Sequence, residues 1–296
     1  MITHYLNLYQ KPKAGNRFIR RYRVYNYKHK ISALGGFDTA LCDVAIPLNQ
    51  AELFLDQYLG NRIAIYVDNP AAAIWEGFIN RITFSVGNCQ HTISLDEMVN
   101  RAAVIYTLTG ATNPTSSSIV NNTDSQAIYG IKAEKVDLGF QYSAGSAVTT
   151  AAANTIIAQQ AWPKASSVPG SSGGLVTLEM LGFYHTLKWE AFTSASTTTP
   201  TLTTIITADI LPIDNTGVFF DDTDTSALAA NAQTINRNRV RGQTAWDVLQ
   251  QLAEIGDAAN KWVVGISPTD PNTKTRRLYY RAFNSTIVYT AKRRAE

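Results

Sequence analysis

The stretch IWEGFINRITFSV, residues 74–86, decides the fold class. Large apolar residues alternate with polar ones along most of this run, which is the period of a β-strand with one buried face. Gly87 and Asn88 follow it and predict a tight reversal into another strand-like run that begins at Cys89. This region therefore predicts antiparallel β-structure.

The same alternation recurs before this stretch. Gly35 and Gly36 open one of the preceding strand-like runs, and a segment with apolar residues at helical spacing stops at Gly60. The further strands are predicted at residues 2–9, 18–27, 33–45 and 62–67, and one short helix or turn pair at 48–60. We expect residues 1–108 to form a compact antiparallel domain, a small β-barrel.

The middle of the chain is different in composition. Residues 109–125 are rich in Ser, Thr and Asn, and a long loop of this kind predicts a domain boundary. A short helical turn and a strand are expected within 126–139, and an Ala-rich helix at 143–162, ending before Pro163. Residues 164–174 are expected to be a flexible connector. We therefore assign 109–174 as a linker and helical connector.

Residues 175–296 are expected to form a second β-rich domain. Two strands around Gly182 are predicted within 175–192, followed by a polar break running into a strand by residue 211. Thr244 caps a predicted amphipathic helix over 244–256. The chain then predicts a hairpin from KWVVGIS (261–267) and RRLYYRAF (276–283), with a further strand in TIVYTAKRR (286–294). The expected fold class is thus mainly β with a few short helices, a β-rich α+β fold with two small barrel-like domains and helical connectors.

Charge is distributed unevenly along the 296 residues. Residues 1–37 carry eight Lys and Arg and no acid, and residues 272–296 carry seven against one Glu, while the stretch between them has 11 basic and 22 acidic residues. The resulting subtotals of +8, −11 and +6 give the net charge of +3. Basic ends around an acidic middle suit self-assembly or nucleic-acid binding, and an ordinary solvated surface is the alternative.

Signatures of catalysis are scarce. The four histidines are far apart in sequence, and no metal-binding HExxH motif, Walker A loop or GxGxxG motif occurs. The acidic run Asp221-Asp222-Thr223-Asp224 could bind a hard cation through oxygen ligands, but it lacks the spacing of an EF-hand, which favours a solvated loop. We expect no enzyme activity, no cofactor and no resident metal.

The two cysteines, Cys42 and Cys89, are too few for a disulfide scaffold in a chain of this length, so a reducing cytoplasm is the expected place of synthesis. The N-terminus lacks the apolar core of a secretion signal, and no run approaches the roughly 18 apolar residues of a membrane span. We expect no membrane anchor.

The order of these features resembles tailed-bacteriophage baseplate and tail-tip hub proteins. IWEGFINRITFSVG (74–87) resembles the family's "p-x-W-x-G-x-I" strand, and DSQAIYGIKAEKVDLG (124–139) resembles its "S-x-x-x-Y-G" turn, which an Ala-rich helix follows in both cases. Residues 242–283 resemble the late helix and hairpin with an "L-x-Y" strand. The flanking strands at 62–67 and 91–98 fit the same order.

This resemblance implies a structural protein of the virion. Family members form rings around the tail axis, connect the tail tube to the tip, and surround a channel for DNA or the tape-measure protein. The resemblance implies a homo-oligomeric ring, a trimer in preference to a hexamer, that contacts tube, distal-tail, tip or tape-measure proteins and meets DNA only in passage. Large hub proteins often continue into further modules, whereas this sequence stops soon after the late hairpin. A short hub or a distal-tail ring is therefore expected.

The basic ends then become candidate docking surfaces between subunits. The candidate interface residues are Arg17, Arg20, Arg21, Tyr22, Arg23, Tyr25, Arg276, Arg277, Arg281, Arg293 and Arg294. Two other classes stay open. Surface aromatics and Thr/Asn-rich loops would suit a carbohydrate- or receptor-binding tail module, and aromatics interleaved with Arg and Lys in 17–30 would suit single-stranded nucleic acid.

Overall fold

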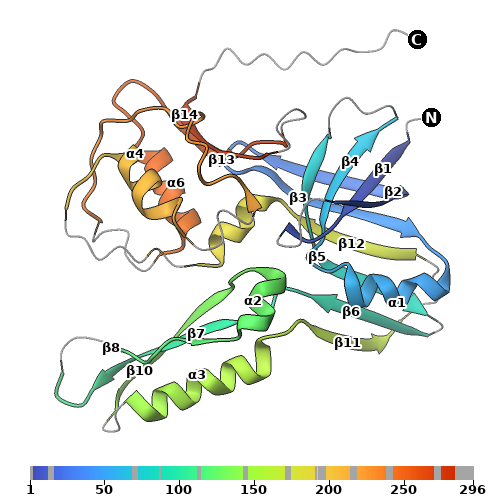
Figure 1. The fold of residues 1–296 in the computed structure, drawn as a ribbon, viewed down its shortest axis with the longest axis horizontal. Coiled ribbons are helices and arrows are strands. Elements are labelled where there is room, and N and C mark those ends of the chain that lie inside the picture. The colour runs from blue at the N-terminus through green and yellow to red at the C-terminus, as the bar shows by residue number, and fades with distance from the viewer. Residues whose placement is uncertain are drawn as a thin grey trace.

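The structure is a computed structural model with three parts: a β-barrel, a lobe in which one helix covers a small sheet, and a mostly helical C-terminal unit (Figure 1). It describes residues 3–12, 17–68, 73–86, 88–111, 115–142, 146–170, 175–190, 192, 198–213, 219–237, 243–269 and 275–283.

Six antiparallel strands close the barrel, which confirms the expected mainly β fold. They are β1 (His4–Tyr9), β2 (Phe18–Ser32), β3 (Gly36–Ala45), β4 (Arg62–Val67), β5 (Trp75–Val86) and β12 (Leu175–Leu181). They follow the order β5-β12-β3-β2-β1-β4, and β4 pairs with β5 to complete the ring. Helix α1 (Leu48–Gln57) packs on this barrel, its Phe54 ring lying 5.3 Å from that of Tyr22.

The deciding strand, β5, is shared between the barrel and an extension of the sheet. Its first residues pair with β4, with Trp75 opposite Ile65, whereas its second half pairs with β6 (Cys89–Ser94). Strand β11 (Lys164–Pro169) pairs in turn with β6 at the end of the sheet. Because β5 is 12 residues long, it can close the barrel and still carry this extension.

Two segments correct the expected domain division. The predicted flexible connector 164–174 contains β11, and β12, expected in the second domain, lies between β3 and β5 of the barrel. Strand β11 is exposed on both faces, so its sequence lacks the alternation that marks a half-buried strand. The boundary at 174/175 therefore does not separate two sheets.

The lobe is inserted in sequence between β6 and β11. Its strands are β7 (Arg101–Leu108), β8 (Thr115–Ser116), β9 (Val120–Asn121) and β10 (Ala133–Tyr142), and its helices are α2 (Thr123–Tyr129) and α3 (Ser146–Gln160). The helix predicted at 143–162 is confirmed, with Ala153 and Ile157 packed on the buried face of β7. The predicted 109–125 linker is partly structured, since it contains β8, β9 and the start of α2.

The C-terminal unit contains the 3₁₀ helix η2 (Phe183–Lys188), α4 (Leu202–Ile205), the π-helical turn η3 (Ile206–Ile210), α6 (Ala245–Ile255), and the hairpin β13 (Trp262–Ile266) and β14 (Leu278–Ala282). The helix capped by Thr244 and the hairpin are confirmed, and Asp247 completes a capping box with Thr244. The strand expected within 286–294 lies outside the described residues.

Two strands predicted in this unit are helical. Residues 183–188 form η2, and the predicted strand before residue 211 is α4 followed by η3. The buried residues Leu202, Ile205, Ile206 and Ile210 recur at helical spacing, although their β-branched neighbours favour a strand. In the described residues this unit has one two-stranded sheet in place of a second barrel.

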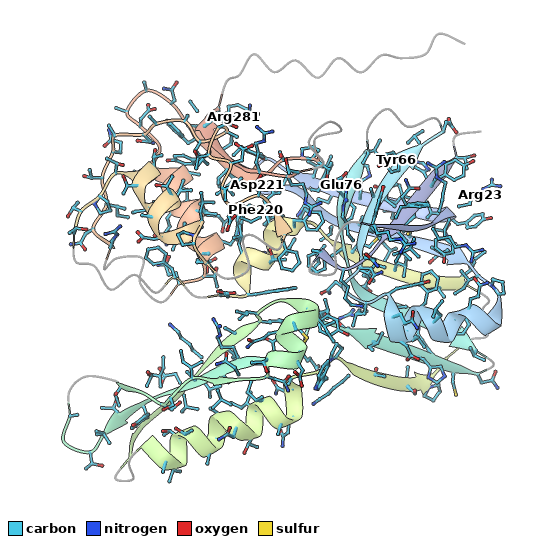
Figure 2. All side chains as sticks on the ribbon, in the orientation of Figure 1. Arg23, Tyr66, Glu76, Phe220, Asp221 and Arg281 are labelled. Atoms are coloured by element: carbon cyan, nitrogen blue, oxygen red, sulfur yellow. The ribbon has the colours of Figure 1, made fainter. Side chains whose placement is uncertain are left out.

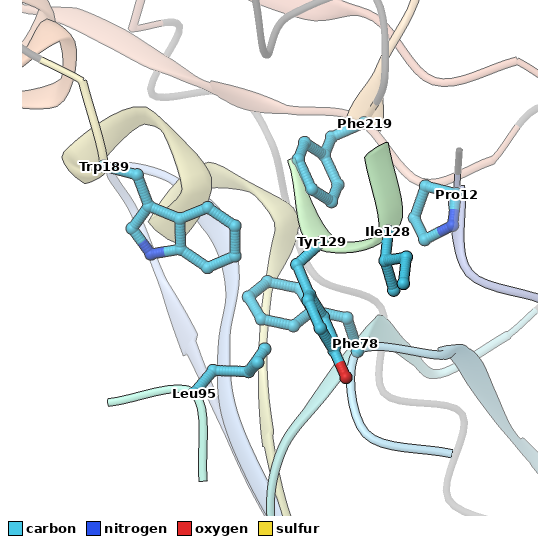
Figure 3. A pocket seen from close by; sticks show the side chains of 8 residues that line it. Pro12, Phe78, Leu95, Ile128, Tyr129, Trp189 and Phe219 are labelled. Atoms are coloured by element: carbon cyan, nitrogen blue, oxygen red, sulfur yellow. The ribbon is translucent and has the colours of Figure 1, made fainter. Parts of the chain in front are cut away.

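An aromatic joint connects the three parts (Figure 3). Trp189, which follows η2, lies edge-on to Phe78 of β5 and to Phe219, with ring centroids 5.5 Å and 5.7 Å away. Leu95 and Tyr129 of α2 line the same small cavity. The amide of Ala133, at the start of β10, also donates a hydrogen bond to the Trp189 carbonyl at 2.8 Å. Trp189 thus contacts the barrel, the lobe and the C-terminal unit.

Candidate functional site

One wall of the barrel, formed by β2, β1 and β4, carries a pattern of arginine and tyrosine, and we call it the Tyr/Arg wall. Strand register sets the pattern, since Arg23 lies opposite Tyr5, which in turn lies opposite Tyr66. One step along, Arg21 lies opposite Asn7. Residues two apart on a strand share a face, so these side chains all project from the outer face of the barrel. The inner positions between them are filled by core residues such as Leu6, Val24 and Ile65.

The arginines of this wall lie beside aromatic rings. Arg21 lies 5.5 Å from the centre of the Tyr5 ring and donates from Nε to Oδ1 of Asn7 at 2.8 Å. Arg23 lies 5.5 Å from the centre of the Tyr25 ring. Within the described residues neither guanidinium forms an ion pair with an acid. Both arginines and Tyr25 are exposed, so their charge and aromatic surface are available to a partner.

Toward β5 the same wall becomes buried beneath the C-terminal unit. The Arg62 guanidinium lies 4.4 Å from the centre of the Tyr9 ring. Burial raises the pKa of the Tyr66 phenol, and a hydrogen bond with Tyr9 and the nearby Glu76 raise it further. Tyr66 is consequently a neutral phenol at physiological pH.

The predicted residues of the N-terminal basic segment divide between two faces. Arg17, Arg20, Arg21, Arg23 and Tyr25 are exposed. Arg20 points to the other side of β2 from its neighbours, where it lies over the Tyr22 ring and donates to Oε1 of Gln50 at 3.3 Å. Tyr22 corrects the prediction of an interface residue, because its side chain is buried against Phe54 in the core. Its position on β2 has the inward parity, so it cannot contribute to the outer wall.

The predicted C-terminal residues do not join this wall. Figure 2 shows Arg23 and Arg281 on opposite sides of the molecule. Arg281 is exposed beside Tyr279, whereas Arg277 pairs with Asp224 at 3.3 Å. Arg276 was also predicted as an interface residue, and the structure corrects this because its side chain is buried. Arg293 and Arg294 lie outside the described residues.

Arg276 belongs to a buried charge cluster between the barrel and the C-terminal unit. Its guanidinium lies 3.9 Å from the centre of the Phe183 ring, and its Nε donates to the Phe219 carbonyl at 2.9 Å. Burial and the positive charge of Arg62 together lower the pKa of Arg276 to about 9, although the negative charge of Glu76 acts in the opposite direction. Glu76 lies 3.7 Å from Arg62. Among the described residues it is the only acid that forms an ion pair with a member of this cluster. The cluster is an internal attachment of the C-terminal unit.

Sequence reasoning missed the tyrosines of this wall. Tyr5, Tyr9 and Tyr66 come from strands β1 and β4, which are separated by more than 50 residues of chain. Their outward parity was readable in ITHYLNLY and RIAIYV, but the neighbouring strands were needed to place them beside Arg21 and Arg23.

The cavities and grooves give weaker evidence of a functional site than the Tyr/Arg wall does. The cavity in Figure 3 has a volume of about 10 Å³, too small for a ligand beyond a water molecule. A wider groove of about 330 Å³ lies between the lobe and the C-terminal unit, lined in part by Ala103, Ile119, Ala133 and Ile213. Among the described residues, no group of three or more His, Cys, Asp or Glu side chains is placed to hold a metal ion. No helix of the described chain is both long and apolar enough to cross a bilayer.

No protein-family model, curated protein or solved structure matches this chain.

Proposed function

We propose that this protein is a structural component of a bacteriophage tail tip or baseplate. It forms a homo-oligomeric hub ring that connects the tail tube to the tip and surrounds the channel for DNA and the tape-measure protein. The observation that carries the proposal is the closed barrel with an exposed wall of arginine and tyrosine, two of the residue types enriched in protein interfaces. The order of the hub-like sequence segments supports the tail location.

The partners follow from this role. Copies of the same chain form the ring, a trimer in preference to a hexamer, and tube, distal-tail, tip or tape-measure proteins bind to its faces. DNA contacts the protein only in passage. The protein is synthesised in the host cytoplasm and resides in the virion. A distal-tail ring is the close alternative, since it uses the same kind of self-association.

Purified phage particles that encode this chain test its location. We expect proteomic analysis to detect the chain in intact particles at a copy number of three or six per tail, and gold-labelled antibodies to bind at the tail end distal to the capsid. Absence of the chain from particles that contain the other tail proteins would contradict the proposal. Label along the full tail length would instead indicate a tube protein.

The Tyr/Arg wall also favours a second candidate, a single-stranded nucleic-acid-binding protein. Exposed Tyr25 offers a ring on which a base could stack, while Arg21 and Arg23 could pair with phosphates. Binding of this kind weakens steeply as salt rises, because counterions are released on contact. A filter-binding titration with a labelled oligonucleotide at 50 and 200 mM salt distinguishes it from a ring protein, which should show weak binding with no defined site size.

A further inference from the structure

The wall of the barrel beside the Tyr/Arg wall is a second exposed sheet face. In the ring order β5-β12-β3-β2-β1-β4, strands β3, β12 and β5 form the remaining half, which adjoins β2 through β3 and β4 through β5. Strands β6 and β11 widen this face on the side of β5. We call this five-stranded surface the hydroxyl wall.

Register places a row of short polar side chains across the hydroxyl wall. Strand by strand, the opposed residues are Asp43, Thr177, Thr83, Thr92 and Ser166. Thr177 donates to Oδ1 of Asp43 at 2.7 Å, and the hydroxyls of Thr83 and Thr92 are 3.2 Å apart. Each of the five residues is partly or fully exposed to solvent. The row is therefore accessible to a partner.

Among the described residues the hydroxyl wall carries three acidic groups, Asp43, Asp96 and Glu179, against two basic ones, Arg81 and Lys164 of β11. Asp43 and Glu179 lie on adjacent strands of this face, and Asp96 lies at its end, where Arg81 pairs with both Glu179 at 3.2 Å and Asp96 at 2.6 Å. One guanidinium is thus shared between two carboxylates. Within the described residues Asp43 accepts hydrogen bonds only from the neutral groups of Asn26 and Thr177. The hydroxyl wall can therefore accept cations from a partner.

The two walls are complementary in charge. Arg21 and Arg23 on the Tyr/Arg wall have no acidic partner among the described residues, and Asp43 on the hydroxyl wall has no basic one. Both walls are outer faces of one barrel, and they adjoin where Tyr25 of β2 lies opposite Asp43 of β3. A surface that binds a different surface on the next copy makes a heterologous contact, which closes into a ring when the rotation between copies allows it.

We propose that the Tyr/Arg wall of one copy docks on the hydroxyl wall of the next copy, so that Arg21 and Arg23 lie against Asp43 and Glu179 of the neighbouring subunit. This inference rests on the self-association in the proposed function and names the two surfaces responsible. The tyrosines supply contact area around the charges, and the hydroxyl row offers hydrogen-bonding groups beside the carboxylates. Each copy then uses both walls, as a ring requires.

Charge reversal tests the pairing in the full-length chain. In one variant Arg21→Glu and Arg23→Glu reverse the Tyr/Arg wall, and in the other Asp43→Lys and Glu179→Lys reverse the hydroxyl wall. We expect each variant alone to lose association by at least about 100-fold in Kd, because like charges then oppose each other across the contact. An equimolar mixture should restore association between the two variants, measured by native mass spectrometry as complexes that contain both. A ring of three chains then has two restored contacts and one between like variants, whereas a ring of six can alternate the two variants throughout.

A matched control keeps the result interpretable. Lys135→Glu with Lys261→Glu makes the same change in net charge as the arginine variant at two exposed residues away from both walls, and it should assemble like the wild type. Circular dichroism and thermal unfolding establish that each variant is folded. If the wild type assembles and both wall variants still assemble, or if the folded variants fail to combine, the pairing is overturned while self-association stands. A wild type that remains monomeric overturns the ring itself and the pairing with it.

Discussion

Glu76 in the barrel and Thr269 in the C-terminal unit are joined by two hydrogen bonds. The Thr269 hydroxyl donates to Oε2 of Glu76 at 2.6 Å, and its amide donates to the same oxygen at 3.1 Å. Arg62 and Arg276 each donate to the Thr269 hydroxyl as well, at 3.1 Å and 3.3 Å. One carboxylate therefore organises two buried guanidiniums at the attachment of the C-terminal unit.

We expect Glu76→Gln to destabilise the protein by about 3 kcal/mol. The change preserves the shape of the side chain but leaves Arg62 and Arg276 buried without their counter-charge, which is far costlier than the loss of an exposed ion pair. Urea unfolding of the two proteins measures the difference. Glu97→Gln, at an exposed position, is the control and should change the free energy of unfolding by less than about 0.5 kcal/mol. A loss below 1 kcal/mol at Glu76 would contradict the role given to this carboxylate.

Trp189→Ala should cost about 3–5 kcal/mol, because it empties the aromatic joint between Phe78 and Phe219. Trp162→Ala is a matched control, since the Trp162 side chain is 45% exposed and its removal leaves no closed cavity. We expect a difference of at least 2 kcal/mol between the two variants in chemical unfolding. Equal losses would show that the joint does not hold the three parts together.

Sequence patterns predicted most of the barrel because its strands carry the signal in their own residues. Alternation in β1, β2, β4 and β5 reports one buried face, and Thr244 with Gly256 marks the ends of α6. The patterns did not predict β11, whose stability comes from pairing with β6 and not from burial. Nor did they predict that Arg276 would be buried, since that depends on Arg62 and Glu76 from distant strands.

The exposure of the candidate interface residues was likewise predicted correctly where local residues decide the outcome and incompletely where distant strands do. Arg21 and Arg23 share the outward parity of β2 and were predicted with Tyr22, which has the inward parity and packs in the core. Charge counts identified a basic segment but not its faces. The aromatic half of the Tyr/Arg wall required the register of β1 and β4, which local sequence does not specify.

Asp38 should make the protein sensitive to acid between about pH 4 and pH 2. Burial alone would raise the pKa of this carboxyl, but hydrogen bonds from Tyr184, Lys30 and His185 outweigh it and hold the pKa at about 2. Because this folded-state pKa lies below the unfolded value of about 3.9, the stabilisation is present above pH 4 and is lost as pH falls through 2. It amounts to about 2 kcal/mol at neutral pH.

The Asp38→Asn variant measures this contribution. We expect it to be less stable than the wild type at pH 7 and to approach the wild type as pH falls toward 2, when unfolding free energies are compared across the range. A difference that stays constant from pH 7 to pH 2 would show that the loss comes from altered packing and not from the charge of Asp38.

The two thiols should react differently. Cys42 is fully buried in β3, and burial raises the pKa of its thiol, so the reactive thiolate is scarce. Cys89 is exposed at the start of β6. We expect a thiol reagent to label one site per native chain, assigned to Cys89 by peptide mapping, and two sites in denaturant. Rapid labelling of Cys42 in the native protein would contradict the closed barrel.

The oligomeric mass of the full-length wild type tests the central claim most directly. We expect native mass spectrometry at micromolar concentration to give a single closed species of three chains, each of 32.5 kDa, with six chains as the other ring. A closed ring should keep this mass as the protein concentration rises, because no free wall remains for further addition. A monodisperse monomer over the same range of concentration would contradict the proposed ring.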